Sequence, residues 1–170
     1  MIRVQFAHGL EGSPQGAKSV FLREHFDAGI PAMDTSDFAS CVAHQLRELM
    51  RFEPNVLVGS SFGGAVVLEL LRRGDYSGPA LLLAPAAGIY SVPLELPPNT
   101  AVTIVHGSHD HVVPLADSRQ LATTGTPSLI RFIELDDNHA LGSLVHTGQL
   151  GRLVSDLYEL SRGSRPVSDR

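Results

Sequence analysis

The chain has 170 residues, a length typical of one domain that leaves no room for a separate cofactor-binding domain. Hydrophobic residues make up 43% of the chain and charged residues 18%, so it can bury a sizeable core. Thirteen Lys and Arg against eighteen Asp and Glu leave a net charge of −5 with neither sign in a block, which argues against nucleic acid and anionic membranes as partners.

Cysteine content and the N-terminal residues bear on location. The single cysteine, Cys41, cannot form an internal disulfide, so an oxidising compartment offers the chain no advantage. Residues 1–7 reach a His-Gly pair before an apolar run of signal-peptide length accumulates, and no stretch is apolar for long enough to span a membrane. We therefore expect a cytoplasmic protein.

Short β-branched runs alternate with longer helical stretches along the chain, which is typical of β-α-β units around a parallel sheet. The first predicted strand covers residues 2–7, and a helix capped by Ser13 and opened by Pro14 follows to about residue 27. Residues 30–33 form a short second strand. The next helix is capped by Asp34, Thr35 or Ser36, ends before Pro54 and buries a periodic apolar set: Phe38, Val42, Leu46, Leu49 and Met50.

Residues 55–59 contain a Val-Leu-Val run with no polar face, as expected for a central strand covered on both sides. A helix over residues 61–73 stops at Gly74, and further strands are predicted over residues 80–84, 101–105 and 129–135. Helices are predicted from residue 115 to about 123 and from about 147 to 160, the last with Leu150, Leu153, Val154 and Leu157 inward.

These elements predict the α/β class: a three-layer α/β/α sandwich around a mostly parallel sheet of about six strands. The pattern forms one domain over residues 1–160. Residues 161–170 have almost nothing apolar to bury, so we expect a disordered C-terminal tail there.

Residues 59–63 read Gly-Ser-Ser-Phe-Gly and lie between the buried strand and the following helix, the context that a G-x-S-x-G nucleophile elbow requires. The same glycines and serines also suit a plain strand-to-helix turn. In an elbow, Ser61 is exposed at the carboxyl end of the strand, where ligands collect in open α/β sheets. Because a serine hydroxyl is a weak nucleophile, the elbow interpretation demands a histidine and an acid downstream.

Both residue types follow at the ends of later strands. Asp110 comes just after the strand over residues 101–105, and His139 follows the strand over residues 129–135. Each alone also fits a turn or a solvated loop. Because all three residues fall at carboxyl ends of predicted strands, we interpret Ser61, Asp110 and His139 as a catalytic triad in which the acid orients the histidine.

The first strand ends in His8-Gly9, where a glycine lets the backbone approach a substrate closely. The amides of Leu10 and Phe62 are the predicted oxyanion-hole donors, and His8 itself is expected to be structural. A plain turn explains the same glycine.

Other sites are disfavoured by the sequence. His106, His109 and His111 form a cluster of candidate metal ligands, but no cysteine recurs at ligand spacing, so we predict no metal site. Asp136 or Asp137 is a weaker alternative to Asp110, because each is a short step from His139 on one loop. No dinucleotide or P-loop motif is present, and no cofactor is expected.

Together, residues 8–9, 59–64, 107–114 and 138–139 resemble the corresponding motifs of the α/β-hydrolase superfamily. The Gly-Ser-Pro-x-x-x-Lys stretch at residues 12–18 and the short chain are similar to the small, lidless YqiA-type esterases. The resemblance covers residues 1 to about 160 and implies hydrolysis of carboxylic esters through an acyl-enzyme. We expect the chain to lack two features of the superfamily, the two initial antiparallel strands and a cap. Only residues 85–100 lie at the position where larger members insert a cap.

We therefore expect a serine hydrolase acting on small esters or other acyl substrates, with no nucleic acid or membrane partner. The same triad also serves a thioesterase or a small amidase or peptidase. A non-catalytic binding protein that retains the fold is the alternative from another class. Chain length of the acyl group, the leaving group and the oligomeric state stay open.

Overall fold

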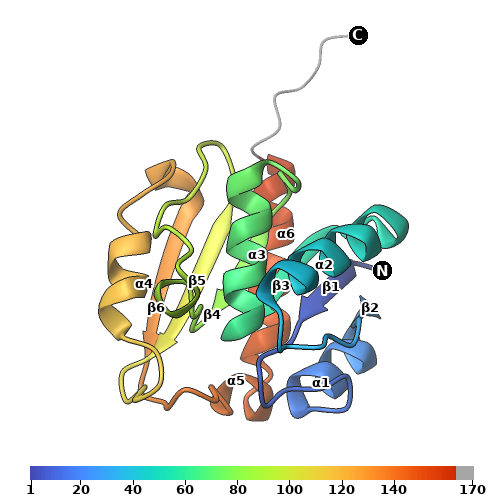
Figure 1. Cartoon of the computed structure of the whole chain (residues 1–170), viewed down its shortest axis with the longest axis horizontal. Helices are drawn as coiled ribbons and strands as arrows, with labels where there is room; N and C mark the ends of the chain where they lie inside the picture. The colour runs from blue at the N-terminus through green and yellow to red at the C-terminus, as the bar shows by residue number, and fades with distance from the viewer. Residues whose placement is uncertain (164–170) are drawn as a thin grey trace, which may run out of the picture.

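Short apolar runs form six strands of one sheet in the computed structural model, which describes residues 1–163 (Figure 1). All neighbouring strands pair in parallel, which confirms the predicted α/β class. The strand order is β2-β1-β3-β4-β5-β6. The strands are β1 (Arg3–Ala7), β2 (Asp27–Gly29), β3 (Val56–Ser60), β4 (Ala80–Leu83), β5 (Val102–Gly107) and β6 (Ile130–Leu135).

Successive side chains of the strands enter two separate cores because they point to opposite faces of the sheet. Val56 and Val58 of β3 belong to one core, while Leu57 between them belongs to the other. The first core is covered by α1 (Ala17–His25), α5 (Ser143–His146) and α6 (Gln149–Gly163), and the second by α2 (Phe38–Phe52), α3 (Phe62–Arg73) and α4 (Leu115–Leu121). The short 3₁₀ turns η1 (Gly88–Tyr90) and η2 (Pro127–Leu129) complete the fold.

The strand order places a switch point between β1 and β3. From β1 the chain first adds β2 on one side and then returns to place β3 on the other side. Connections therefore leave the carboxyl ends of β1 and β3 in opposite directions, which opens a crevice at that edge of the sheet. Leu10, which follows β1, and Ser61, which follows β3, border this crevice.

The predicted second strand at residues 30–33 is wrong. β2 covers Asp27–Gly29 instead, with Asp27 opposite Arg3 and Gly29 opposite Gln5. Helix α1 already ends at His25, so the chain reaches the sheet edge earlier, and Pro31 has no amide hydrogen for a strand ladder. Ser13 does not cap α1 either, because residues 13–16 form a turn in which the Gly16 amide donates to the Ser13 carbonyl.

Helix α2 is capped by Asp37, whose side chain accepts a hydrogen bond from the Ser40 amide, and not by residues 34–36 as predicted. Met50 was expected inward but is 70% exposed. The reason is a buried polar pair: Gln45 occupies the inward face and its Oε1 accepts from Gln5 Nε2 on β1 at 2.7 Å. Apolar periodicity alone therefore misplaces the buried face of this helix.

From β3 onward, the structure follows the predictions more closely. Gly74 ends α3 with a φ of 74°, and the four predicted apolar residues of α6 are buried. The short helix α5 was not predicted. Helix α6 continues through Gly163, so the first three residues of the predicted tail are helical, while its remainder, 164–170, lies outside the described residues. None of the described helices has both the length and the apolar character needed to cross a membrane.

Two glycines let β1, β3 and α3 approach each other more closely than side chains permit. A Cβ on Gly63 would lie 1.9 Å from the Ala7 carbonyl oxygen, and a Cβ on Gly59 would lie 2.5 Å from the Gly63 carbonyl oxygen. Both of these oxygens belong to the backbone, one of β1 and one of α3, so they cannot rotate away. Only glycine fits at both positions, and their contact sets where α3 begins.

We predict that Gly63→Ala lowers the free energy of unfolding by about 3 kcal/mol or more, because the added methyl group forces α3 away from β1. Urea unfolding at neutral pH measures this change. Gly151→Ala in α6 is the matched control, since its methyl group would meet Phe21 at an ordinary 3.4 Å and alanine favours the helix. Equal stability of the Gly63→Ala variant and the wild type would contradict the close-approach argument.

Candidate active site

Ser61 is held in a strained turn between β3 and α3. Its backbone has φ 54° and ψ −115°, a combination that costs a non-glycine residue about 1–3 kcal/mol. Hydrogen bonds hold it there: the Ser61 amide donates to the Leu83 carbonyl, and the Ser61 carbonyl accepts from Ala65 and Ala86. The turn presents the hydroxyl at the carboxyl edge of the sheet, as the elbow motif predicts.

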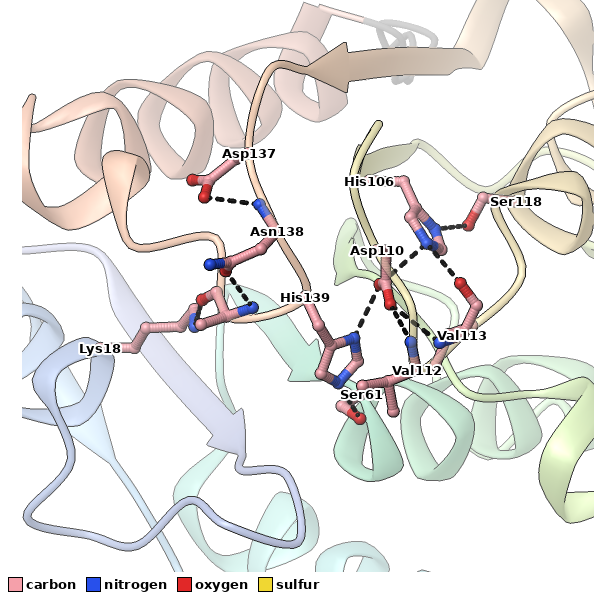
Figure 2. A network of polar contacts seen from close by, with 11 residues as sticks. Lys18, Ser61, His106, Asp110, Val112, Val113, Ser118, Asp137, Asn138 and His139 are labelled. Carbon is pink, nitrogen blue, oxygen red and sulfur yellow. Dashed lines mark hydrogen bonds and ion pairs between the residues drawn. The ribbon is translucent and has the colours of Figure 1, made fainter.

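His139 connects Ser61 to Asp110. Its Nε2 lies 2.8 Å from Ser61 Oγ, and its Nδ1 lies 2.7 Å from Asp110 Oδ2 (Figure 2). An ionised carboxylate only accepts, so Nδ1 carries the proton and Nε2 is free to accept from the Ser61 hydroxyl. The structure thus brings the three predicted residues into one chain of hydrogen bonds.

Asp110 is a buried carboxylate surrounded by donors. Its side chain is 0% exposed, and Oδ1 accepts from the Val112 amide at 2.8 Å and the Val113 amide at 2.9 Å. Burial alone would raise the pKa of Asp110, but the hydrogen bonds from Val113, His139 and Val112 outweigh it and lower that pKa. The group is therefore held as a carboxylate in a fixed orientation.

A second histidine, His106 at the end of β5, touches the same carboxylate (Figure 2). Its Nε2 lies 3.0 Å from Asp110 Oδ2, its Nδ1 lies 2.7 Å from Ser118 Oγ, and its side chain is 0% exposed. Burial lowers the pKa of His106, with Asp110 acting in the opposite direction. In the neutral ring Nδ1 accepts the Ser118 hydroxyl, so Nε2 carries the proton and shares it between the Val113 carbonyl at 3.2 Å and Asp110 Oδ2 at 3.0 Å. His106 is therefore a positioning residue for Asp110.

The sequence analysis considered His106 only as part of a candidate metal cluster and missed this contact. The available signal was a histidine in an otherwise apolar strand, since a buried histidine requires polar partners. His109 is exposed and pairs with Asp136 at 2.7 Å, whereas His106 is buried against Asp110, so the two side chains do not converge on one site. Within residues 1–163, no group of three or more His, Cys, Asp and Glu residues is arranged to hold a metal.

The two alternative acids do not contact His139. Asp136 pairs with His109 at the surface, and Asp137 accepts hydrogen bonds from the Asn138 amide and from Ser143. Both carboxylates are therefore occupied elsewhere, and of these three aspartates it is Asp110 that contacts His139.

The loop after β1 lies against Ser61. A Cβ on Gly9 would be 3.3 Å from Ser61 Cβ, and the Gly9 carbonyl accepts from His8 Nδ1 at 2.8 Å and from the Gly12 amide at 3.1 Å. In a trans peptide the next amide hydrogen points opposite to that carbonyl, so these bonds orient the Leu10 amide. Within the described residues that amide donates no backbone hydrogen bond. The Phe62 amide is the first of α3 and has no carbonyl of its own helix to bind.

A cavity of about 360 Å³ opens beside Ser61 and His139. Its walls come from the loop after β1, from α1, from the elbow and from the loops after β5 and β6: Leu10, Glu11, Gly12, Lys18, Ser60, Ser61, Val112, His139 and Ala140. No residue of the segment 85–100 lines it. That segment packs elsewhere, with Tyr90 against the rings of Phe38 and Phe62. The cavity is large enough for a small ligand.

Comparison with known proteins identifies the fold. No family model and no curated protein sequence matches the chain. Among solved structures, a hydrolase of the α/β superfamily from Xanthomonas campestris is similar with a TM-score of 0.70, 21% identity and coverage of 96% of this chain and 99% of that one. One of the metagenome-derived lipolytic enzymes LipS and LipT has a TM-score of 0.71 at 14% identity, covering 93% and 94%. An enol-lactonase from Burkholderia xenovorans has a TM-score of 0.67 at 13% identity, covering 92% and 90%.

These likenesses show that the chain has the α/β-hydrolase fold, which is built here on six parallel strands. The structural neighbours are hydrolases. At such identities a shared fold does not transfer a substrate, because the superfamily supports many reactions on one scaffold.

The buried His106 predicts a pH dependence of stability. Because its pKa in the folded protein lies below the unfolded value of about 6.5, the unfolded chain binds the proton first as the pH falls. Stability is therefore lost below about pH 6.5, and His106→Gln removes part of that loss. Urea unfolding at pH 7.5 and 5.5 measures it for the wild type and the variant.

His111→Gln, which replaces an exposed histidine on the neighbouring loop, is the matched control for this experiment. An equal fall in stability for the wild type and His106→Gln would show that the buried ring does not exclude the proton.

Proposed function

We propose that the protein is a serine hydrolase that cleaves small carboxylic esters through an acyl-enzyme. Ser61 is the nucleophile, His139 the general base and acid, and Asp110 the residue that orients His139. The observation that carries the proposal is the hydrogen-bond chain from Ser61 Oγ through His139 to Asp110, with distances of 2.8 and 2.7 Å. It is further supported by a cavity at the nucleophile and by hydrolases among the structural neighbours.

In the first half of the reaction, Ser61 Oγ attacks the carbonyl carbon and its proton passes to His139 Nε2. The carbonyl oxygen becomes an oxyanion, which the amides of Leu10 and Phe62 stabilise. When the tetrahedral intermediate collapses, the bond to the alcohol oxygen breaks and that oxygen takes the proton from His139. The alcohol leaves, and the acyl group remains on Ser61.

In the second half, water attacks the acyl carbon while His139 Nε2 accepts one of its protons. Collapse of the second intermediate breaks the bond to Ser61 Oγ, which recovers the proton from His139. The products are a carboxylic acid and the free enzyme, so the cycle needs no cofactor. Throughout, the buried carboxylate of Asp110 stabilises the imidazolium that forms on each transfer.

A thioesterase or a small amidase or peptidase uses the same groups, and comparison of short esters with acyl-CoA and anilides separates these activities. We favour esters of small acids because the cavity is open and no cap covers it. Because of the motif at residues 12–18, we propose the YqiA-type esterases as the subgroup. Because the chain has a single cysteine, we also propose a cytoplasmic location.

Ser61→Ala should lower kcat for short 4-nitrophenyl esters by at least about 10⁴-fold, because no other group in the cavity replaces the nucleophile. The measurement is the initial rate with purified protein of verified folding. Ser60→Ala is the matched control, since this serine lines the same cavity but makes no contact with His139. A Ser61→Ala variant as fast as the wild type would falsify the assignment.

A fluorophosphonate probe followed by peptide mapping tests the same assignment without a chosen substrate. We expect one labelled residue, Ser61. A folded protein that does not react with the probe would instead support a non-catalytic binding protein.

Asp110→Asn should lower kcat by about 10⁴-fold, by fixing the wrong tautomer of His139. The amides of Val112 and Val113 donate to Oδ1, so an amide side chain would keep its oxygen there and turn its NH₂ group toward His139 Nδ1. Nδ1 would then have to accept, and Nε2 would carry the proton that it should remove from Ser61. The measurement is kcat for a short ester.

Asp137→Asn is the control for the acid, since its carboxylate faces Ser143 and Asn138 and not His139. If Asp137→Asn were the more damaging of the two changes, Asp110 would not be the triad acid.

A further inference from the structure

Lys18 is the single lysine of the chain, and the other twelve of the thirteen basic residues are arginines. It lies in the first turn of α1 and lines the cavity beside Ser61 and His139. Among residues 1–163, no other lysine or arginine lines this cavity. The one lysine ammonium group of the protein therefore lies next to the proposed nucleophile.

The hydrogen bonding of Lys18 is incomplete. Its Nζ donates to the carbonyl of Ala140, the residue after His139. Within residues 1–163, no carboxylate lies at ion-pairing distance from Nζ, although Asp137 attracts it from farther away. An ammonium has three N–H donors, so two are available to a ligand in the cavity.

This position does not favour a cation for stability. Burial lowers the pKa of Lys18, which means that its charged form has lost part of its hydration. The first turn of α1 contains no acidic residue, and a positive charge there faces the positive end of the helix dipole. A cation that is partly dehydrated and unpaired gains most from an anion that arrives with the substrate.

Resting on the proposed function, we propose that Lys18 binds a carboxylate carried by the substrate, so that the enzyme prefers small acidic esters. The acidic group enters the cavity of about 360 Å³ together with the ester, which limits the substrate to a short molecule. Two N–H groups of Lys18 donate to the carboxylate while the third keeps its bond to Ala140.

Glu11 also lines the cavity and carries the opposite charge. Its side chain is exposed, whereas Lys18 is half-buried, so water and salt screen Glu11 more strongly. The net attraction inside the cavity is therefore toward anions.

A second role for Lys18 is to anchor the loop that carries His139, through the bond to Ala140. Loss of such an anchor would slow neutral and acidic esters by the same factor, because it disturbs the shared catalytic groups. Loss of a carboxylate contact would slow acidic esters more. The ratio of the two kcat/KM values separates the roles.

The test uses two matched pairs of esters with the wild-type protein and Lys18→Met. In the first pair the charge is on the acyl side: mono-4-nitrophenyl glutarate against 4-nitrophenyl valerate. In the second pair it is on the alcohol side: 4-acetoxybenzoate against 4-acetoxybenzamide. We expect the wild type to prefer the acidic member of one pair, and that preference to fall by about 10- to 100-fold in Lys18→Met, mainly through KM.

Lys18→Arg, which retains the charge, should restore part of the preference, and Arg23→Met, which removes a cation of α1 outside the cavity, should leave it unchanged. Rising NaCl concentration should weaken the preference of the wild type. If Lys18→Met does not fold, acetylation of the wild type at its single lysine removes the same charge.

The outcomes are separate. A wild type that hydrolyses neutral esters without preference for either acidic ester overturns this inference alone. An unchanged preference in Lys18→Met also overturns it and leaves Lys18 as a loop anchor. A folded protein that hydrolyses none of the four esters and ignores the fluorophosphonate probe contradicts the proposed function itself.

Discussion

The contact between the start of α3 and the end of β1 is the constraint on which the candidate site depends. Gly63 lies so near the Ala7 carbonyl that no side chain fits between them, and Gly59 faces Gly63 in the same way. Because the helix begins against the sheet, the chain has to turn within Ser61, which takes an unfavourable backbone conformation. The same closeness brings the loop after β1 to the serine, so one packing contact orients the hydroxyl and builds a wall of the cavity.

A buried negative charge organises the other half of the site. The side chain of Asp110 has no exposure to water, and an isolated carboxylate in such a place would be strongly destabilised. Four donors compensate: the amides of Val112 and Val113 and the rings of His139 and His106. Each donor also restricts the rotation of the Asp110 side chain, so the hydrogen bonds that favour the charged carboxylate also fix its orientation. The side chain of His139 is partly exposed, so it can contact a substrate, and its hydrogen bond to the Asp110 carboxylate fixes its orientation.

Sequence reasoning predicted the parts of this arrangement that depend on local pattern. Ser61, Asp110 and His139 were found because the carboxyl ends of parallel strands share one edge, so that position after a strand predicts proximity. The contact of His106 with Asp110 and of Lys18 with Ala140 depends on side-chain directions that no local pattern contains. The second strand was misplaced because an edge strand of three residues has little apolar signal. Met50 was wrongly expected to be buried because the polar Gln45 occupies the inward face of α2.

The distribution of charge around the serine follows from the same geometry. The donors to Asp110 all lie on the β5 and β6 side of Ser61, whereas Lys18 reaches the cavity from α1 on the β1 side. A substrate that enters between them meets a base on one side and an unpaired cation on the other. Asp110 faces its own donors on the other side of Ser61, and Asp137, which attracts Lys18 from beyond ion-pairing distance, accepts hydrogen bonds from Ser143 and Asn138. The fold thus separates the negative charge of Asp110, which orients His139, from the positive charge of Lys18, which is available to a ligand. This separation is the physical basis of the proposed preference of the cavity for anions.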